Sequence, residues 1–165
     1  MRYIKAPEYP DNYIFDYDNN LFLAGSILGA SNWQEDIIKI KKVRKQDQKE
    51  YTLLDRYNIY NPRRDNFNSL ELEIQRKQIE WEFYHLSEVC GKILFWFAEE
   101  TLAPITLFEY GKVLGRATGD ITNVFVGVHP NYARKDDVII QTELEQPYID
   151  IVFSLDDLVQ QIIND

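Results

Sequence analysis

The sequence predicts an open α/β protein with a buried parallel sheet, and three observations support this fold class. Residues 93–97 form an unbroken apolar run of β-branched and aromatic side chains, which suits a strand covered on both faces. A helical pattern precedes this strand, and a polar loop with a second helical pattern follows it. Ligands of such sheets bind outside the carboxyl ends of the strands, so we expect function just after residue 97.

The bulk composition limits the class of protein. The chain has 165 residues, 45% hydrophobic and 14% aromatic, so we expect a single globular domain over residues 1–165. A formal net charge of -9 argues against a nucleic acid polymer as partner, because a phosphate backbone needs a basic surface. Cys90 is the single cysteine and no apolar run is long enough for a membrane span. We therefore expect a cytoplasmic protein without disulfides or membrane contact.

The N-terminal part predicts an arm, a strand and a helix. Residues 1–20 are rich in tyrosine and proline, and their apolar positions do not recur at a regular spacing, so we expect an irregular arm. Residues 21–24 are apolar and end at Gly25, which predicts the first strand. Ser31 or Asn32 is the expected N-cap of the next helix. The turn between strand and helix resembles a phosphate-binding turn without its full glycine fingerprint, and the alternative is a plain tight turn.

A second strand and a polar loop come next. Residues 53–54 and 57–60 are apolar or aromatic enough for a strand, which Pro62 ends. Arg63 and Arg64 in the loop are suited to hold a carboxylate or a phosphate. The alternative is a solvated loop whose arginines pair with nearby acidic residues.

Residues 68–88 predict a helix, because their apolar positions recur every three to four residues. Trp81 and His85 share one side of this helix, where we expect His85 to pack or to lie at the surface. The second histidine of the chain is His129. No group of His, Cys and carboxylates has the spacing of metal ligands, so we expect no metal site.

The rest of the chain predicts further alternation of helices and strands. Residues 105–116 form a helix by their pattern, and residues 121–128 a buried strand. Residues 138–140 are β-branched and suggest a fifth, shorter strand, and residues 148–153 an extended stretch. Ser154 has the character of the N-cap of a last helix.

Four short pieces follow one another along the chain: Phe-Leu-Ala-Gly-Ser at 22–26, Asn-Pro-Arg at 61–63, Trp-Glu at 81–82 and Phe-Glu-Tyr-Gly at 108–111. Together they resemble the nucleoside 2-deoxyribosyltransferase-like family. The resemblance implies a flavodoxin-like three-layer fold with a five-stranded, mostly parallel sheet. It also implies cleavage or exchange of the N-glycosidic bond of a (deoxy)nucleoside or its monophosphate, without a metal or other cofactor.

The resemblance further implies roles for individual residues. Glu109 stands where the family has its nucleophilic glutamate, and Glu82 where an acidic residue of the preceding helix approaches the reaction centre. The first turn would meet the sugar or a 5′-substituent. The candidate substrate-binding residues are Gly25, Ser26, Asn61, Arg63, Trp81, Glu100 and Thr101.

Two carboxyl groups suit this chemistry on physical grounds. A fixed carboxylate stabilises positive charge at the anomeric carbon, or attacks it to form a covalent glycosyl-enzyme. A second carboxyl in the same dry pocket has a raised pKa and can protonate the leaving base. We predict Glu109 as nucleophile and Glu82 as the acid or as a group that orients the base. The alternatives are a glutamate that only favours the helix dipole at position 109, and a solvated helix face at position 82.

Two positions depart from the family pattern. Ala103 stands six residues before the predicted nucleophile, where transferases often carry an aspartate and monophosphate glycosidases a serine. Leu28 occupies the first turn, where the monophosphate enzymes tend to have an arginine. Both differences count against a monophosphate hydrolase. Glu99, Glu100 or Thr101 are candidates for the role that the aspartate or serine has in those enzymes.

Three interpretations therefore stand. The first is a nucleoside deoxyribosyltransferase or N-glycoside hydrolase, and the second is a non-catalytic module that binds a nucleoside or nucleotide on the same fold. The third is a flavin or phosphate-transfer protein, which is disfavoured because the first turn lacks a hydroxyl-rich phosphate loop and no aspartate cluster ends the first strand. We expect a small nucleoside or nucleotide as partner, and the resemblance also implies a homo-oligomer.

Overall fold

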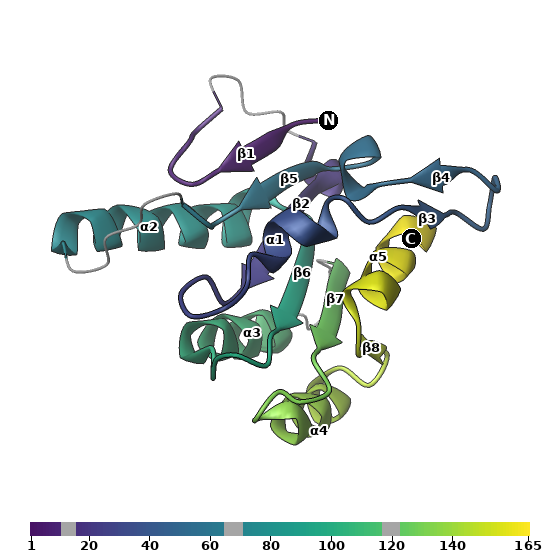
Figure 1. Ribbon diagram of the computed structural model, residues 1–165. Coiled ribbons are helices and arrows are strands. Elements are labelled where there is room, and N and C mark those ends of the chain that lie inside the picture. Colours follow the sequence, from purple (N-terminus) through teal and green to yellow (C-terminus); the bar gives the residue numbers. More distant parts are fainter. Residues whose placement is uncertain (11–15, 65–70, 117–122) are drawn as a thin grey trace.

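The computed structural model describes residues 1–10, 16–64, 71–116 and 123–165 (Figure 1). They build a six-stranded sheet of order β1-β5-β2-β6-β7-β8, in which every neighbouring pair is parallel. The predicted α/β class is thus confirmed, with six strands rather than five. The strands are β1 (Tyr3–Lys5), β2 (Asn20–Gly25), β5 (Asn58–Asn61), β6 (Lys92–Phe97), β7 (Asn123–Val128) and β8 (Ile151–Val152).

The central strand β6 is buried on both faces, as its continuous apolar run predicts. Phe95 and Phe97 belong to the core on one side of the sheet, and Leu94 and Trp96 to the core on the other. The side chains alternate because successive residues of a strand point to opposite faces. β6 pairs with β2 on one side and β7 on the other, which places it in the middle of the sheet.

Helices cover both faces of the sheet and complete a three-layer arrangement (Figure 1). α2 (Leu72–Tyr84), α3 (Pro104–Arg116) and α4 (Lys135–Glu145) contribute side chains to the core that contains Phe95. α1 (Trp33–Ile37) and α5 (Leu155–Asn164) contribute to the opposite core. The N-caps fall where the sequence places them, since Asn32 precedes α1 and the Ser154 hydroxyl accepts a hydrogen bond from the Asp157 amide ahead of α5.

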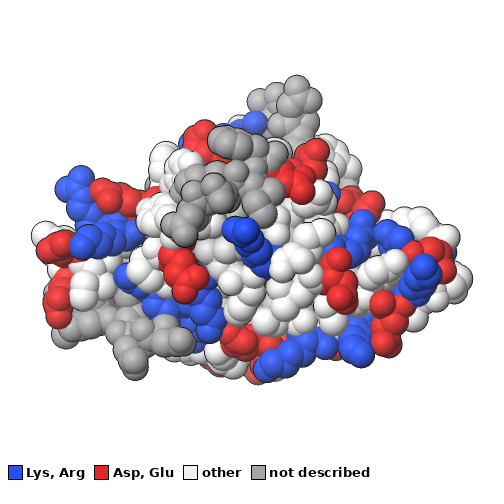
Figure 2. Space-filling view, turned by 90° about the horizontal axis from the view of Figure 1, so that it is seen from above, with Lys and Arg blue, Asp and Glu red and all other residues white. Residues whose placement is uncertain are grey.

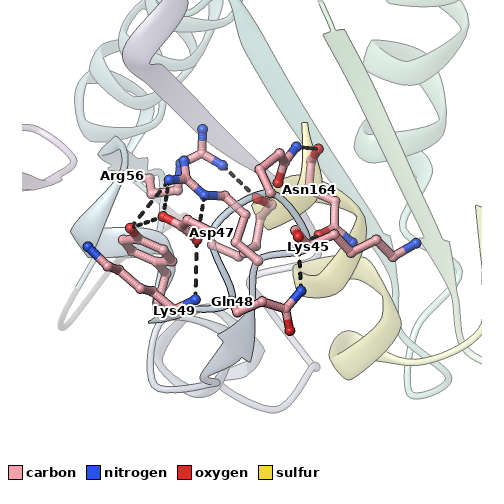
Figure 3. A network of polar contacts seen from close by, with 10 residues as sticks. Lys45, Asp47, Gln48, Lys49, Arg56 and Asn164 are labelled. Carbon is pink, nitrogen blue, oxygen red and sulfur yellow. Dashed lines mark hydrogen bonds and ion pairs between the residues drawn. The ribbon is translucent and has the colours of Figure 1, made fainter.

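A two-stranded antiparallel ribbon, β3 (Lys42–Val43) and β4 (Glu50–Tyr51), extends from the α1 side. Its tip is held by an ion pair between Arg44 and Asp47, and Asp47 also accepts the Tyr51 hydroxyl at 2.7 Å. The tip is bonded to α5 as well, because the Lys45 amide donates to the Asn164 side chain at 3.0 Å (Figure 3). The sequence pattern did not predict this ribbon.

Three predicted elements need correction. Residues 1–20 are not wholly irregular, since Tyr3–Lys5 forms the edge strand β1 beside β5. Residues 53–54 belong to a 3₁₀ turn, Leu53–Asp55, instead of a strand; this turn has a capping box between Thr52 and Asp55. Residues 138–140 are not a strand but lie in α4, where Val138 and Thr142 face the core one helical turn apart. A β-branched composition misled here, because helical spacing of buried positions outweighs strand propensity.

The predicted helix at 68–88 is α2 followed by a π-helical turn, His85–Val89, and its first three positions lie outside the described residues. Positions 121 and 122 of the predicted strand 121–128 also lie outside them, and β7 accounts for the rest. Of the stretch 148–153, only Ile151–Val152 forms a strand.

The order of the strands defines where a ligand can bind. The chain runs from β2 outward to β5 and then crosses back over β2, through α2, to β6 on the other side. Connections therefore leave the carboxyl ends of β2 and β6 in opposite directions, which opens a crevice at that edge of an α/β sheet. Gly25 ends β2 at this edge, and a Cβ atom there would lie 2.5 Å from the Trp33 ring and 2.7 Å from the Trp96 carbonyl oxygen.

Candidate functional site

A pocket of about 350 Å³ lies at the carboxyl ends of β2 and β6, between the loop after β2 and the helices α2 and α3. Its volume is in the range of small-molecule sites. The wall is mostly apolar, and the charged side chains in it are Glu82 and Glu109. The lining residues are Phe22, Ala24, Gly25, Ser26, Ile27, Leu28, Pro62, Gln75, Gln78, Ile79, Glu82, Thr101, Ala103, Pro104, Ile105, Thr106 and Glu109.

Glu82 enters the pocket from α2. Its Oε1 atom accepts a hydrogen bond of 2.7 Å from Nε2 of Gln78, one helical turn earlier. Burial raises the pKa of Glu82 to about 7, although the Gln78 hydrogen bond and the charge of Arg64 both act to lower it. A carboxyl group of this kind retains a proton near neutral pH.

Glu109 enters the same pocket from α3. Burial raises its pKa to about 8, and the charge of Glu82 acts in the same direction while Lys112 opposes it. The two glutamates thus interact electrostatically, and their protons belong to the pair. No other described side chain donates a hydrogen bond to the Glu109 carboxylate, which leaves its oxygens to the pocket.

The loops after β2 and β6 meet at the pocket through two hydroxyl groups. Ser26 Oγ lies 3.1 Å from Thr101 Oγ1, and Thr101 Oγ1 also accepts the backbone N–H of Ala103 at 2.9 Å. Ala103 has a positive φ of 47°, which an L-residue seldom adopts. The Thr101 bond holds this strained residue just before Pro104 opens α3.

Arg63 and Asn61 do not line the pocket. The Arg63 guanidinium donates to the Gln34 side chain at 2.9 Å and to the Ser31 carbonyl at 2.8 Å, so it holds the loop after β2 from behind. The Asn61 side chain donates to the Tyr3 hydroxyl at 2.7 Å and accepts the Arg63 amide at 2.9 Å. Arg63 therefore holds the first loop, whereas Asn61 binds the edge strand β1 and the backbone of Arg63.

Trp81 and Glu100 also point elsewhere. Trp81 is fully buried, and its indole N–H donates to the Glu8 carbonyl at 2.8 Å. Its ring centroid lies 4.1 Å from that of His85 in a tilted arrangement, and His85 is buried too and hydrogen-bonded to the Trp81 carbonyl. The Glu100 carboxylate accepts the Ser31 amide at 3.2 Å and joins the two loops from the outside. The structure therefore brings together Glu82, Glu109, Gly25, Ser26 and Thr101 out of the predicted set.

Several pocket residues were not predicted from the sequence. Gln78 could have been found, because it lies four positions before Glu82 and so on the same face of a helix. Ile79 and Ile105 offered no such signal, since apolar helix residues are normally assigned to the core. Both are exposed at the rim of the pocket instead.

Figure 2 shows the distribution of charged side chains on one face of the molecule. Figure 2 views the edge formed by β1, where acidic and basic side chains are interspersed. Within the described parts of the chain, no three or more His, Cys, Asp and Glu side chains come close enough together to hold a metal ion. No helix in the same ranges has the length and apolarity that a membrane crossing requires.

Fold and site define an α/β protein with a pair of half-buried glutamates in a pocket at the switch point of a parallel sheet. A family model described as nucleoside 2-deoxyribosyltransferase like matches residues 18–132. This match spans most of the chain, so the protein belongs to that family. No curated protein matches the sequence.

Proposed function

We propose that this protein cleaves or exchanges the N-glycosidic bond of a (deoxy)nucleoside-type substrate through a covalent intermediate on Glu109. The observation that carries the proposal is the pair of carboxyl groups in one pocket, with the pKa of Glu82 raised to about 7 and that of Glu109 to about 8. The two carboxyl groups titrate as a pair and share a proton at neutral pH. The order of the two pKa values by itself favours that proton on Glu109, so the nucleophilic role of Glu109 rests on its position in the family pattern and requires the proton to lie on Glu82 when substrate is bound. Family membership supports the same chemistry.

In the proposed first step, a Glu109 carboxylate oxygen forms a bond to the anomeric carbon as the carbon–nitrogen bond breaks. The electron pair of that bond leaves with the base, which takes up the proton of Glu82. In the second step, the nitrogen of another base or the oxygen of water attacks the anomeric carbon, and Glu82 takes the released proton. Glu109 is regenerated, and the configuration at the anomeric carbon is retained overall.

The two roles follow from how each carboxyl group is held. Glu82 is fixed by the hydrogen bond from Gln78, which suits a group that must aim a proton at one atom. Glu109 has an electron pair available to the pocket, because no other described side chain occupies its oxygens. The apolar wall would cover the flat base and keep water away from the ester.

Sugar hydroxyls would meet the joined loops on the other side of the pocket. Ser26 and Thr101 both line it and carry the hydroxyl groups that can donate to or accept from a sugar. Thr101 therefore takes, in this proposal, the place that an acidic or serine side chain would otherwise fill at position 103.

A non-catalytic binding module is the second candidate function. The observation in its favour is Ala103, which is buried in the pocket wall and has no polar side chain to orient a sugar or a base. Such a module would be stabilised thermally by nucleosides that it never converts.

We also propose a cytoplasmic homo-oligomer in which a second copy covers the mouth of the pocket. Leu28, Ile79 and Ile105 are exposed and line the pocket, and Phe108 is exposed on α3 next to Glu109 in the sequence. Apolar side chains gathered in this way favour burial against a protein surface. Light scattering would show a monomer if this part of the proposal is wrong, and Phe108→Glu should shift an oligomer toward the monomer.

Base release and base exchange test the proposal. The protein is incubated with a pool of nucleosides, deoxynucleosides and their monophosphates, with and without a free acceptor base, and products are separated by chromatography. We expect turnover that Glu109→Gln abolishes and that Glu143→Gln, an exposed change of the same kind on α4, leaves unchanged. Absence of products together with a raised melting temperature would favour the binding module.

A further inference from the structure

Gln78 connects the backbone of one loop to the acid of the proposed pair. It lies on α2, its side chain is buried at 5% exposure, and it lines the pocket. Its Nε2 atom donates to the Pro62 carbonyl at 2.7 Å and to Oε1 of Glu82 at 2.7 Å. A primary amide has two N–H groups, so both are committed.

The Pro62 carbonyl fixes the orientation of this amide. A carbonyl oxygen accepts hydrogen bonds and never donates, so only the nitrogen of Gln78 can face it at 2.7 Å. Rotating the amide by half a turn would place two oxygens against each other. The amide oxygen of Gln78 is buried and has no hydrogen-bond partner among the described residues. This orientation therefore leaves one acceptor unsatisfied, while both N–H groups form hydrogen bonds.

The carbonyl oxygen of a protonated carboxyl group is a better hydrogen-bond acceptor than its hydroxyl oxygen. The N–H of Gln78 therefore favours Oε1 of Glu82 as the carbonyl oxygen and Oε2 as the oxygen that carries the proton. We propose that Gln78 is a positioning residue, which directs the proton of Glu82 to Oε2 and so to the atom available to a leaving group. This inference rests on the proposed function for its consequence in catalysis, although the orientation of the proton does not depend on turnover.

Two charged groups also act on Glu82. Arg64 favours the ionised form of Glu82, and Glu109, from α3, favours the protonated form. Removing Gln78 should thus change both the position and the binding of the proton.

The titration of Glu82 in the free protein tests this inference without any turnover. Its side-chain carboxyl carbon is followed by NMR as a function of pH in the wild type and in Gln78→Met, which keeps the length of the side chain and loses both donors. We expect the midpoint to rise by about one pH unit, since a hydrogen bond to the charged form is lost. An unchanged midpoint in a folded Gln78→Met protein would overturn the inference.

A matched control and a measurement on the wild type guard against misfolding. Gln146 is another buried glutamine, whose Nε2 donates to the Leu114 carbonyl at 3.0 Å away from the pocket. Gln146→Met should leave the Glu82 midpoint unchanged. If Gln78→Met does not fold, the wild type is measured instead. The NMR chemical shifts of the Gln78 side-chain amide protons should then change with pH at the same midpoint as Glu82. Chemical shifts that do not change at that midpoint would overturn the inference.

Kinetics separate this inference from the proposed function. Where the wild type releases base, Gln78→Met should lower kcat about tenfold or more and move the basic limb of the rate profile upward. It should have no further effect in a Glu82→Gln background, because Gln78 acts through Glu82. If Gln78→Met slows base release equally in the wild type and in Glu82→Gln, the positioning role of Gln78 is wrong and the proposed function stands. If Gln78→Met shifts the Glu82 titration midpoint but the wild type converts no substrate, the proposed function is wrong and the positioning role stands.

Discussion

The hydroxyl groups of Ser26 and Thr101 lie 3.1 Å apart and join the loops that follow two adjacent strands, β2 and β6. One loop carries the turn expected to meet a sugar, and the other leads into the helix that carries Glu109. Thr101 has a second bond, to the backbone of the strained Ala103. A single side chain thereby fixes the spacing between the two walls of the pocket.

Thr101→Val tests this connection, because valine has the same shape and no hydroxyl group. Two hydrogen bonds are lost, so the free energy of unfolding should fall by about 1–2 kcal/mol. The KM for the converted substrate should rise as well. Urea denaturation and initial rates measure the two effects, and Thr101→Ser should retain most of both properties. Identical stability and KM in Thr101→Val would show that the hydroxyl bridge has no role.

Gly25→Ala should destabilise the protein at the base of the pocket. A Cβ atom there would meet the Trp33 ring at 2.5 Å and the Trp96 backbone at 2.7 Å, and the backbone cannot move aside cheaply. We expect a loss of about 1–3 kcal/mol in thermal or urea unfolding. Gly111→Ala in α3 is the control, since nothing lies within 4 Å of its Cβ position. That change should be neutral or stabilise the helix by up to about 1 kcal/mol.

Arg63→Met should loosen the first loop although Arg63 does not line the pocket. The guanidinium bonds to Gln34 and to the Ser31 carbonyl would be lost, at a cost of about 1–3 kcal/mol in the free energy of unfolding. Exchange of the backbone amides in the loop after β2 should become faster. Arg134→Met, which removes an exposed pair with Asp137, should leave this exchange unchanged. Equal exchange in the two variants would contradict the structural role of Arg63.

Stability should depend on pH through Glu109. Its pKa is raised from 4.5 to about 8, so the folded protein holds a proton that the unfolded chain has released. The contribution of this group to stability is therefore full at acidic pH and falls as pH rises from 4.5 to about 8. Glu109→Gln removes that loss, so the variant should gain stability relative to the wild type between about pH 5 and about pH 8. Urea unfolding at about pH 5 and at about pH 8 measures this difference in stability, and Glu143→Gln should show no such difference from the wild type.

The sequence was sufficient for the parts of the fold that depend on local patterns. The apolar run at 93–97 required a strand buried on both sides, and the switch-point rule then directed attention to its carboxyl end. Glu82 and Glu109 come together there because the crossovers through α2 and α3 both pack on the same face of the sheet. Such convergence follows from topology, so the order of the elements suffices to anticipate it.

Other features depend on pairings between distant segments, which no local pattern reports. β1 forms only because β5 offers it a parallel edge, and a three-residue strand carries little signal of its own. Arg63 looked available for a ligand, yet its donors are taken by carbonyl groups of a loop some thirty residues earlier in the chain. The part of Gln78 in holding Glu82 depends on the Pro62 carbonyl, whose direction only the folded structure reveals.

Direct detection of the covalent intermediate tests the central claim. The protein is incubated with a deoxynucleoside whose sugar carries fluorine at C2, because the fluorine slows the breakdown of a glycosyl ester, and is then digested and mapped by mass spectrometry. The account predicts release of the base together with a sugar attached to Glu109, and neither in Glu109→Gln. Base release from the parent deoxynucleoside without any label, or a label on another residue, would contradict the assignment of Glu109 as the nucleophile.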